Sequence, residues 1–98
     1  MSVKTLLKSA VSQRFRRPKG PREVLVYSRP GCHLCEEAID VLRRLERRYP
    51  MVIQEVDIRS DPELLRRYDI RIPVVVIDGR IEIEAPIREN ELVRAFRE

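Results

Sequence analysis

The two cysteines of this 98-residue chain stand three positions apart, in the segment Cys32-His33-Leu34-Cys35. An apolar run over residues 24–27 and a turn-like segment over residues 28–31 come directly before them. Apolar residues at helical spacing begin directly after them. This pattern constrains the fold, because a strand has to end and a helix has to begin within a few residues of each other. Two thiols at such a junction can alternate between a dithiol and a disulfide, which indicates redox chemistry.

From Glu23 onward, the apolar pattern alternates between strands and helices. Short apolar or β-branched runs predict strands, and apolar residues three or four positions apart predict helices. Pro50 ends the first helix, and the segment 60–63 has the composition of a helix start. The predicted elements are strands over residues 24–27, 51–58, 72–77 and 80–84, helices over residues 34–49 and 60–69, and a terminal helix that buries Ile87, Leu92, Val93 and Phe96.

The dipeptide Asp78-Gly79 between the last two strands predicts a two-residue hairpin, because both turn positions require positive φ. The strand after it alternates polar and apolar residues, as expected for a half-exposed strand at a sheet edge. The order of elements is therefore βαβ followed by αββα. A right-handed βαβ crossover and a hairpin together predict an α/β fold with a four-stranded mixed sheet flanked by helices.

Residues 1–22 form a basic extension with seven Lys or Arg residues and no acidic residue. Residues 23–98, the predicted globular domain, hold 13 basic and 16 acidic residues, so the high overall pI does not indicate binding to nucleic acid. Within the extension, residues 16–21 predict a linker. The residues before it predict a short amphipathic helix, because their apolar members follow helical spacing: Val3, Leu6, Leu7, Ala10, Val11 and Phe15. The extension could dock on its own domain, remain a tail, or contact a membrane surface or a partner.

We expect a cytoplasmic protein. No run approaches the roughly 18 apolar residues that cross a membrane, and the N-terminus lacks the apolar core of a signal peptide. Two cysteines are also too few for the disulfide scaffold of a secreted domain. In the cytosol, a CxxC pair is catalytic or metal-binding more often than structural.

The thiol chemistry requires a stabilised thiolate, because the thiolate is the attacking form of cysteine. At the start of a helix, Cys32 would face unpaired backbone N–H groups and the positive end of the helix dipole. Arg29 would add a positive charge, and a protonated His33 would favour the thiolate further. Glu36 and Glu37 would oppose this effect. His33 could instead be only an exposed spacer between the cysteines.

A metal or an iron–sulfur cluster is the alternative use of the two thiols. Zinc normally has four ligands, and this chain offers Cys32, Cys35 and a single histidine between them. A complete site would need a second chain or external thiols such as glutathione. We therefore predict no metal site within one chain.

The residues around the cysteines resemble a known family. Residues 27–36, Arg71-Ile72-Pro73 and the Asp78-Gly79 hairpin are similar to the thioredoxin fold, and within it to a small glutaredoxin-like protein. The resemblance covers about residues 23–97. It implies that Cys32 is the exposed nucleophile and that Cys35 resolves the mixed disulfide. It also implies that Arg29, the backbone of Ile72 and a cis-Pro73 bind the incoming disulfide or glutathione.

The chain departs from the family pattern at one place. Glutaredoxins usually have a Gly-Gly pair after the fourth strand, followed by an acidic residue that holds the glutathione amino group. This chain has Glu84-Ala85-Pro86-Ile87 instead, so the resemblance leaves glutathione binding open while it supports the dithiol chemistry.

The leading hypothesis is a monomeric thiol–disulfide oxidoreductase that serves cell redox homeostasis and electron transport. Its partners would be a disulfide-containing protein or a glutathione mixed disulfide, together with a thiol donor or reductase. It would carry no covalently bound cofactor, and glutathione would be a co-substrate. Two alternatives remain: a cluster or metal carrier bridged between two chains through Cys32, and a thioredoxin-like interaction module tethered by the basic extension.

Overall fold

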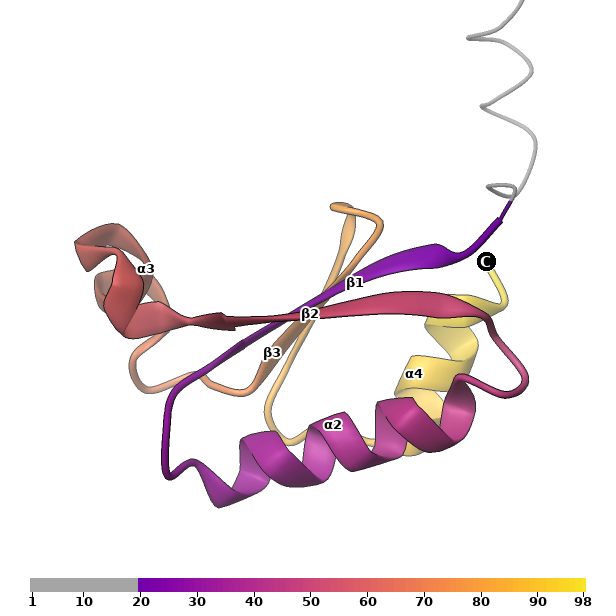
Figure 1. Cartoon of the computed structure of the whole chain (residues 1–98), viewed down its shortest axis with the longest axis horizontal. Coiled ribbons are helices and arrows are strands. Elements are labelled where there is room, and N and C mark those ends of the chain that lie inside the picture. The colour runs from indigo at the N-terminus through magenta and orange to yellow at the C-terminus, as the bar shows by residue number, and fades with distance from the viewer. Residues whose placement is uncertain (1–19) are drawn as a thin grey trace, which may run out of the picture.

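The computed structural model describes residues 20–98, and the helix and most of the linker predicted in the extension lie outside this range. The described part alternates strands and helices in the predicted βαβ and αββα order (Figure 1). Its elements are β1 (Arg22–Ser28), α2 (His33–Leu45), β2 (Met51–Asp57), the short 3-10 helix η1 (Ile58–Ser60), α3 (Pro62–Tyr68), β3 (Val74–Ile77), β4 (Ile81–Glu84) and α4 (Glu89–Phe96).

The four strands form one mixed sheet in the order β2-β1-β3-β4. β1 and β2 are parallel, whereas β1 pairs antiparallel with β3, and β3 pairs antiparallel with β4. β4 is an edge strand whose side chains alternate between half-buried and exposed, as its sequence predicts. The predicted α/β fold with a four-stranded mixed sheet is confirmed.

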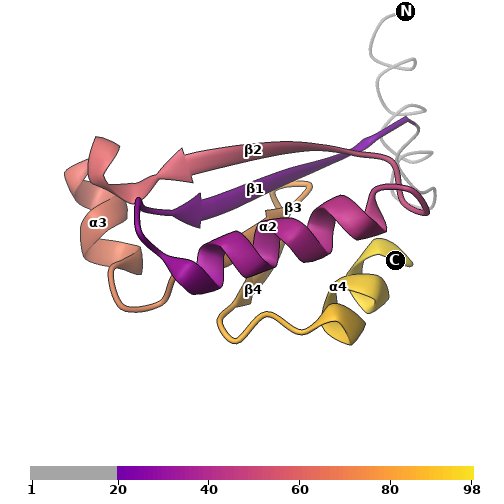
Figure 2. The same ribbon diagram turned by 60° about the horizontal axis from the view of Figure 1, so that its bottom comes forward.

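The main core lies between the sheet and the helices α2 and α4, which cover the same face (Figure 2). Every second strand residue points to this face because side chains alternate along a strand. A second, smaller cluster joins α3 to the opposite face, where the ring of Tyr68 stacks on Tyr27 with centroids 4.5 Å apart. The buried residues of the main core are Val24, Val26, Leu42, Leu45, Met51, Val75, Ile77, Leu92, Ala95 and Phe96.

Several predicted boundaries differ from the observed ones by a few residues. α2 ends at Leu45 instead of Tyr49, and residues 46–48 form a turn in which the Arg48 N–H donates to the Leu45 carbonyl, three residues back, over 3.0 Å. β3 begins at Val74 instead of Ile72, since Pro73 has no N–H to contribute to the sheet. Ile87 packs against the main core from the segment before α4, so it does not belong to the helix.

The hairpin between β3 and β4 is one residue longer than predicted. Asp78 and Gly79 have φ values of 55° and 64°, as the predicted turn requires. The Arg80 N–H then donates to the Ile77 carbonyl over 3.0 Å, and Ile77 pairs with Ile81. Arg80 therefore belongs to the turn and not to β4.

Arg22 connects three parts of the domain. It is the first residue of β1 and is buried, although the sequence groups it with the basic extension. Its guanidinium pairs with Asp78 in the hairpin, and its Nη1 donates to the Phe96 carbonyl of α4 over 2.8 Å. Asp78 Oδ1 also accepts the Glu23 N–H over 3.0 Å. The ion pair and hydrogen bonds of this cluster connect the start of β1 to the hairpin and to the last helix.

Candidate active site

Cys32 is the N-cap residue of α2. β1 ends at Ser28, and Gly31 turns the chain with a φ of 79°, a conformation that favours glycine. The backbone N–H of Cys35 donates to Cys32 Sγ over 3.2 Å, which occupies one of the unpaired donors of the helix start. A thiolate at this sulfur would therefore be stabilised by a hydrogen bond and by the positive end of the helix dipole.

Cys32 and Cys35 form a disulfide, and their Cα atoms are 5.2 Å apart. Cys32 is partly exposed, whereas Cys35 is only 2% exposed. A substrate in solution can therefore approach the sulfur of Cys32 more readily than the sulfur of Cys35. This difference is the geometry that an attacking and a resolving cysteine need.

A depression of about 280 Å³ lies beside the disulfide, and both cysteines line it. Three of its lining residues are acidic, and we call them the acidic wall: Glu36 of α2 and Glu55 and Asp57 of β2. The buried Ser28 hydroxyl donates to Glu55 Oε2 over 2.9 Å and holds that carboxylate in place. The remaining lining residues are Ser28, Arg29, Pro30 and Gly31.

Arg59 fixes the charge of Asp57. Its side chain and its backbone N–H donate to the Asp57 carboxylate over distances of 2.9 to 3.2 Å. These hydrogen bonds, the side-chain bond first, lower the pKa of Asp57 below its ordinary value. Asp57 is therefore held in its ionised form, and its charge is balanced by the Arg59 guanidinium.

Sequence analysis missed Glu55 and Asp57 as neighbours of the cysteines. β1 and β2 are parallel and Ser28 pairs with Asp57, so the last residues of both strands reach the same edge of the sheet. The loop that carries Cys32 leaves from this edge. The predicted parallel pairing of the first two strands was the signal that could have found these carboxylates.

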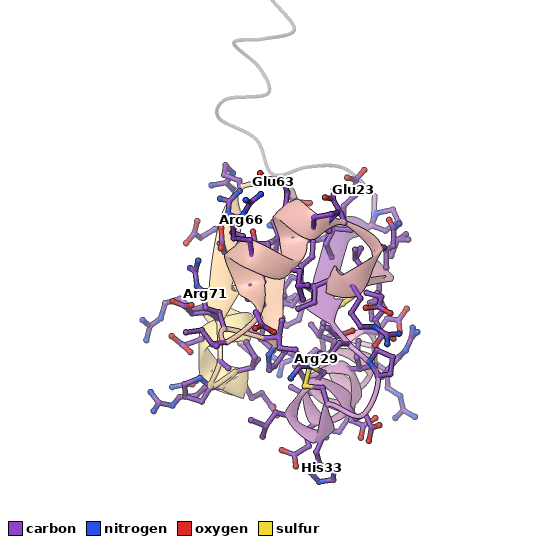
Figure 3. All side chains as sticks on the ribbon, turned by 90° about the vertical axis from the view of Figure 1, so that its left-hand side faces the viewer. Glu23, Arg29, His33, Glu63, Arg66 and Arg71 are labelled. Carbon is purple, nitrogen blue, oxygen red and sulfur yellow. A yellow bond between two sulfur atoms is a disulfide. The ribbon has the colours of Figure 1, made fainter. Side chains whose placement is uncertain are left out.

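Arg29 lies beside the disulfide, as predicted, and Figure 3 shows its side chain next to the two sulfur atoms. Its Nη1 is 3.0 Å from Asp69 Oδ1, and both side chains are about half exposed. His33 points away from the disulfide in the same view. Its Nε2 is 3.2 Å from Glu37 Oε2, and its side chain is 82% exposed. This placement matches the simpler hypothesis, in which His33 is an exposed spacer.

Ile72 and Pro73 precede β3, and the predicted cis peptide bond between them is present. Because Tyr27 pairs with Val74, both residues lie at the edge of the sheet from which the cysteine loop leaves. They do not line the depression; Pro73 is fully buried, and the Ile72 N–H already donates to the Tyr68 carbonyl over 3.2 Å. The Ala85–Pro86 bond is also cis, which sequence analysis did not predict.

Residues 20–98 hold neither a cluster of metal-ligating side chains nor a membrane-spanning helix. In this range, no three His, Cys, Asp or Glu side chains are grouped so that they could hold a metal ion. No helix there is long and apolar enough to span a membrane.

The fold and the disulfide at the start of α2 define a thioredoxin-fold protein with a CxxC pair. The family model of the Glutaredoxin-like domain (DUF836) matches residues 23–97. The chain therefore belongs to this family, and the predicted resemblance is confirmed. A search of curated protein sequences finds no significant match.

Solved structures with similar folds agree with this assignment. Protein Ne2328 from Nitrosomonas europaea is 30% identical, with a TM-score of 0.69 over 84% of this chain and 98% of that one. Target protein XcR50 from X. campestris is 26% identical, with a TM-score of 0.66 over 76% of this chain and 95% of that one. A mutant thioredoxin from Halobacterium salinarum shares the fold at 18% identity, with a TM-score of 0.62 over 80% and 74% of the two chains. The family match and the disulfide-bonded cysteine pair together support a thiol–disulfide redox function.

Proposed function

We propose that this protein is a thiol–disulfide oxidoreductase that reduces disulfide bonds of protein substrates through Cys32 and Cys35. The observation that carries this proposal is the arrangement of the two sulfurs. Cys32 is partly exposed and accepts a backbone hydrogen bond at a helix start, whereas Cys35 is buried behind it. The first residue is suited to attack and the second to resolve.

The reaction would proceed by two exchanges. The Cys32 thiolate attacks one sulfur of the substrate disulfide, so that a Cys32–substrate disulfide forms and the other substrate sulfur leaves and takes up a proton. Cys35 then loses its proton and attacks Cys32 Sγ, which releases the second substrate thiol. The substrate gains two electrons and two protons, and the protein is left with the Cys32–Cys35 disulfide. A thiol donor or a reductase returns it to the dithiol.

The charges around the depression favour protein substrates over glutathione. Glu36, Glu55 and Asp57 line it; Asp57 is paired with Arg59 and the lining cation Arg29 with Asp69, so Glu36 and Glu55 leave the lining with a net negative charge. Glutathione carries a net negative charge at neutral pH, so this wall would repel it. A polypeptide with basic residues beside its disulfide would be attracted instead. Glutathione enters this proposal as an electron donor to be tested and not as the preferred substrate.

A single-turnover assay tests the proposal without assuming a donor. Pre-reduced protein is mixed with disulfide-linked peptides that have basic or acidic residues beside the disulfide, and the thiols released are measured. We expect the basic peptide to react about tenfold faster at low salt, with a smaller difference at high salt because salt screens the charges. The dithiol proposal fails if no disulfide is reduced. Glutathione and a thioredoxin-reductase system are then compared as donors.

Arg29 is expected to affect the rate of attack more than the stability of the fold. In Arg29→Gln, we expect the free energy of unfolding to change by less than about 0.5 kcal/mol, because the pair with Asp69 is exposed. We expect the attack rate to fall about three- to tenfold, since a positive charge beside the thiolate is lost. Ultraviolet absorbance of the thiolate and single-turnover rates measure both effects. Asp69→Asn is the matched control, because it leaves Arg29 in place. Equal thiolate fractions and rates in wild type and Arg29→Gln would refute this role.

A further inference from the structure

The face of the sheet opposite α2 and α4 is only partly covered. Figures 1 and 2 show α3 confined to one end of the sheet, where Tyr68 packs on Tyr27 and Val74. The strand register places further apolar residues side by side on the same face, since Leu25 pairs with Val76. Val52 on β2 pairs with Glu23, lies diagonal to Leu25 on the same face, and is 59% exposed. We name this surface the open face; its residues are Glu23, Leu25, Val52, Gln54, Val56, Val76 and Glu82.

The open face is also acidic. Glu23 and Glu82 point from it, and Glu84 lies next to Glu82 on the same side of β4. Arg71 is the cation shared by this last pair, with its nitrogens 3.8 Å from Glu82 and 2.6 Å from Glu84. Arg67 adds a second guanidinium beside this face, over the ring of Tyr68, and the three carboxylates still leave the surface negative. An occupant of this surface should therefore combine an apolar stripe with positive charges.

Residues 3–15 of the same chain have this composition. Their apolar residues follow helical spacing, and Lys4, Lys8 and Arg14 lie among them. A helix of this length would be about 20 Å long, and the seven residues of β1 extend over about 23 Å. The segment 16–21 can span roughly 20 Å and leads directly into Arg22, at the start of β1 beside Glu23 and Val52. The tether is therefore long enough for the segment to turn back over the sheet.

We propose that the open face is the binding site for residues 3–15 of its own chain, with their apolar stripe on Leu25, Val52 and Val76. The inference is independent of the redox function. It assigns the basic extension a structural partner and removes an exposed apolar patch from the surface.

A spin label tests this arrangement in the full chain. Val52→Cys is made in a background with Cys32→Ser and Cys35→Ser, so that the label attaches only at position 52. We expect it to broaden the amide signals of residues 3–15. The matched control is a label at Arg43→Cys on α2, which lies on the other side of the sheet and should leave these signals sharp. Equal signals with both labels would overturn the proposal.

Other occupants of the open face give different results. In a mixture of a spin-labelled copy and an isotope-labelled copy without the spin label, broadening of the second copy's signals from residues 3–15 would indicate a dimer and overturn the proposal. Binding of the extension to anionic phospholipid vesicles that leaves the label at position 52 without effect would also overturn it.

The thermal stability of variants in the proposed contact provides an independent test of the docking. Val52→Asp and Leu7→Asp should each lower Tm by roughly 4–8 °C in the full chain, and the double variant should lose little more, since both changes remove one contact. Ile70→Asp is the control, because Ile70 is 94% exposed, and we expect a shift below about 2 °C. A Val52→Asp protein as stable as the control would contradict the proposal.

Discussion

Cys32→Ser is expected to lower disulfide reduction by at least about 1,000-fold, to the uncatalysed background, because the attacking sulfur is lost. Cys35→Ser is expected to keep the first exchange and to lose the second. It should therefore accumulate a mixed disulfide between Cys32 and the substrate. The two variants separate the roles that the exposed Cys32 and the buried Cys35 have in the proposed function.

Mass spectrometry of the trapped species distinguishes these outcomes. After a reaction with a disulfide-linked peptide, Cys35→Ser should carry the mass of one peptide, whereas Cys32→Ser and the double variant should carry none. Thermal unfolding of each variant serves as the control for folding, since Cys35 packs in the interior. If Cys32→Ser traps the peptide and Cys35→Ser does not, the assignment of the two roles is reversed. Full activity in Cys32→Ser would exclude the proposed chemistry.

The order of elements could be predicted because it depends on local patterns. The apolar run of β1, the helical spacing of α2 and the Asp78-Gly79 turn each contain their signal within a few residues. Ends of elements were less predictable. Ile87, for example, packs on the main core from the segment before α4. An apolar residue in such a segment looks the same in the sequence as one on the buried face of the helix, so the pattern cannot show where the helix begins.

The candidate site was predictable only in part, because local sequence patterns do not show which distant residues meet. Cys32, Cys35 and Arg29 are neighbours along the chain, so their proximity follows from the sequence. Glu55 joins them from more than twenty positions away, because the register between β1 and β2 brings it to Ser28. The acidic wall, on which the proposed substrate preference depends, comes from pairing between strands and has no local signal.

Arg22→Met is expected to destabilise the domain strongly, because Arg22 is buried, although sequence analysis grouped Arg22 with the basic extension. The substitution removes the partner of Asp78 and the donor to the Phe96 carbonyl. Loss of one member of a buried ion pair costs about 3 kcal/mol, which corresponds to a decrease in Tm of roughly 12–24 °C for a domain of this size. Thermal and urea unfolding of the full chain measure the effect.

A double variant separates the unpaired charge from lost packing. Asn tolerates the φ of 55° at position 78, and its side-chain oxygen can still accept the Glu23 N–H. Arg22 Nη2 is buried without a hydrogen-bond partner among residues 20–98, so the wild-type pair itself carries an unsatisfied donor. Arg22→Met combined with Asp78→Asn should therefore regain part of the stability that Arg22→Met loses. A double variant that is less stable than both single variants would contradict this account.

The same cluster predicts how stability depends on pH. Burial alone would raise the pKa of Asp78, but the hydrogen bonds from the Glu23 N–H and the Arg22 guanidinium outweigh it, and the pKa is lowered. The folded state then holds the proton less tightly than the unfolded chain. The stabilisation is therefore complete above about pH 4 and is lost as the pH falls through the lowered value in the folded state. Urea unfolding at neutral pH and near pH 3 should show a smaller acid-induced loss in Asp78→Asn than in wild type. Equal losses in the two proteins would show that Asp78 does not carry this pH dependence.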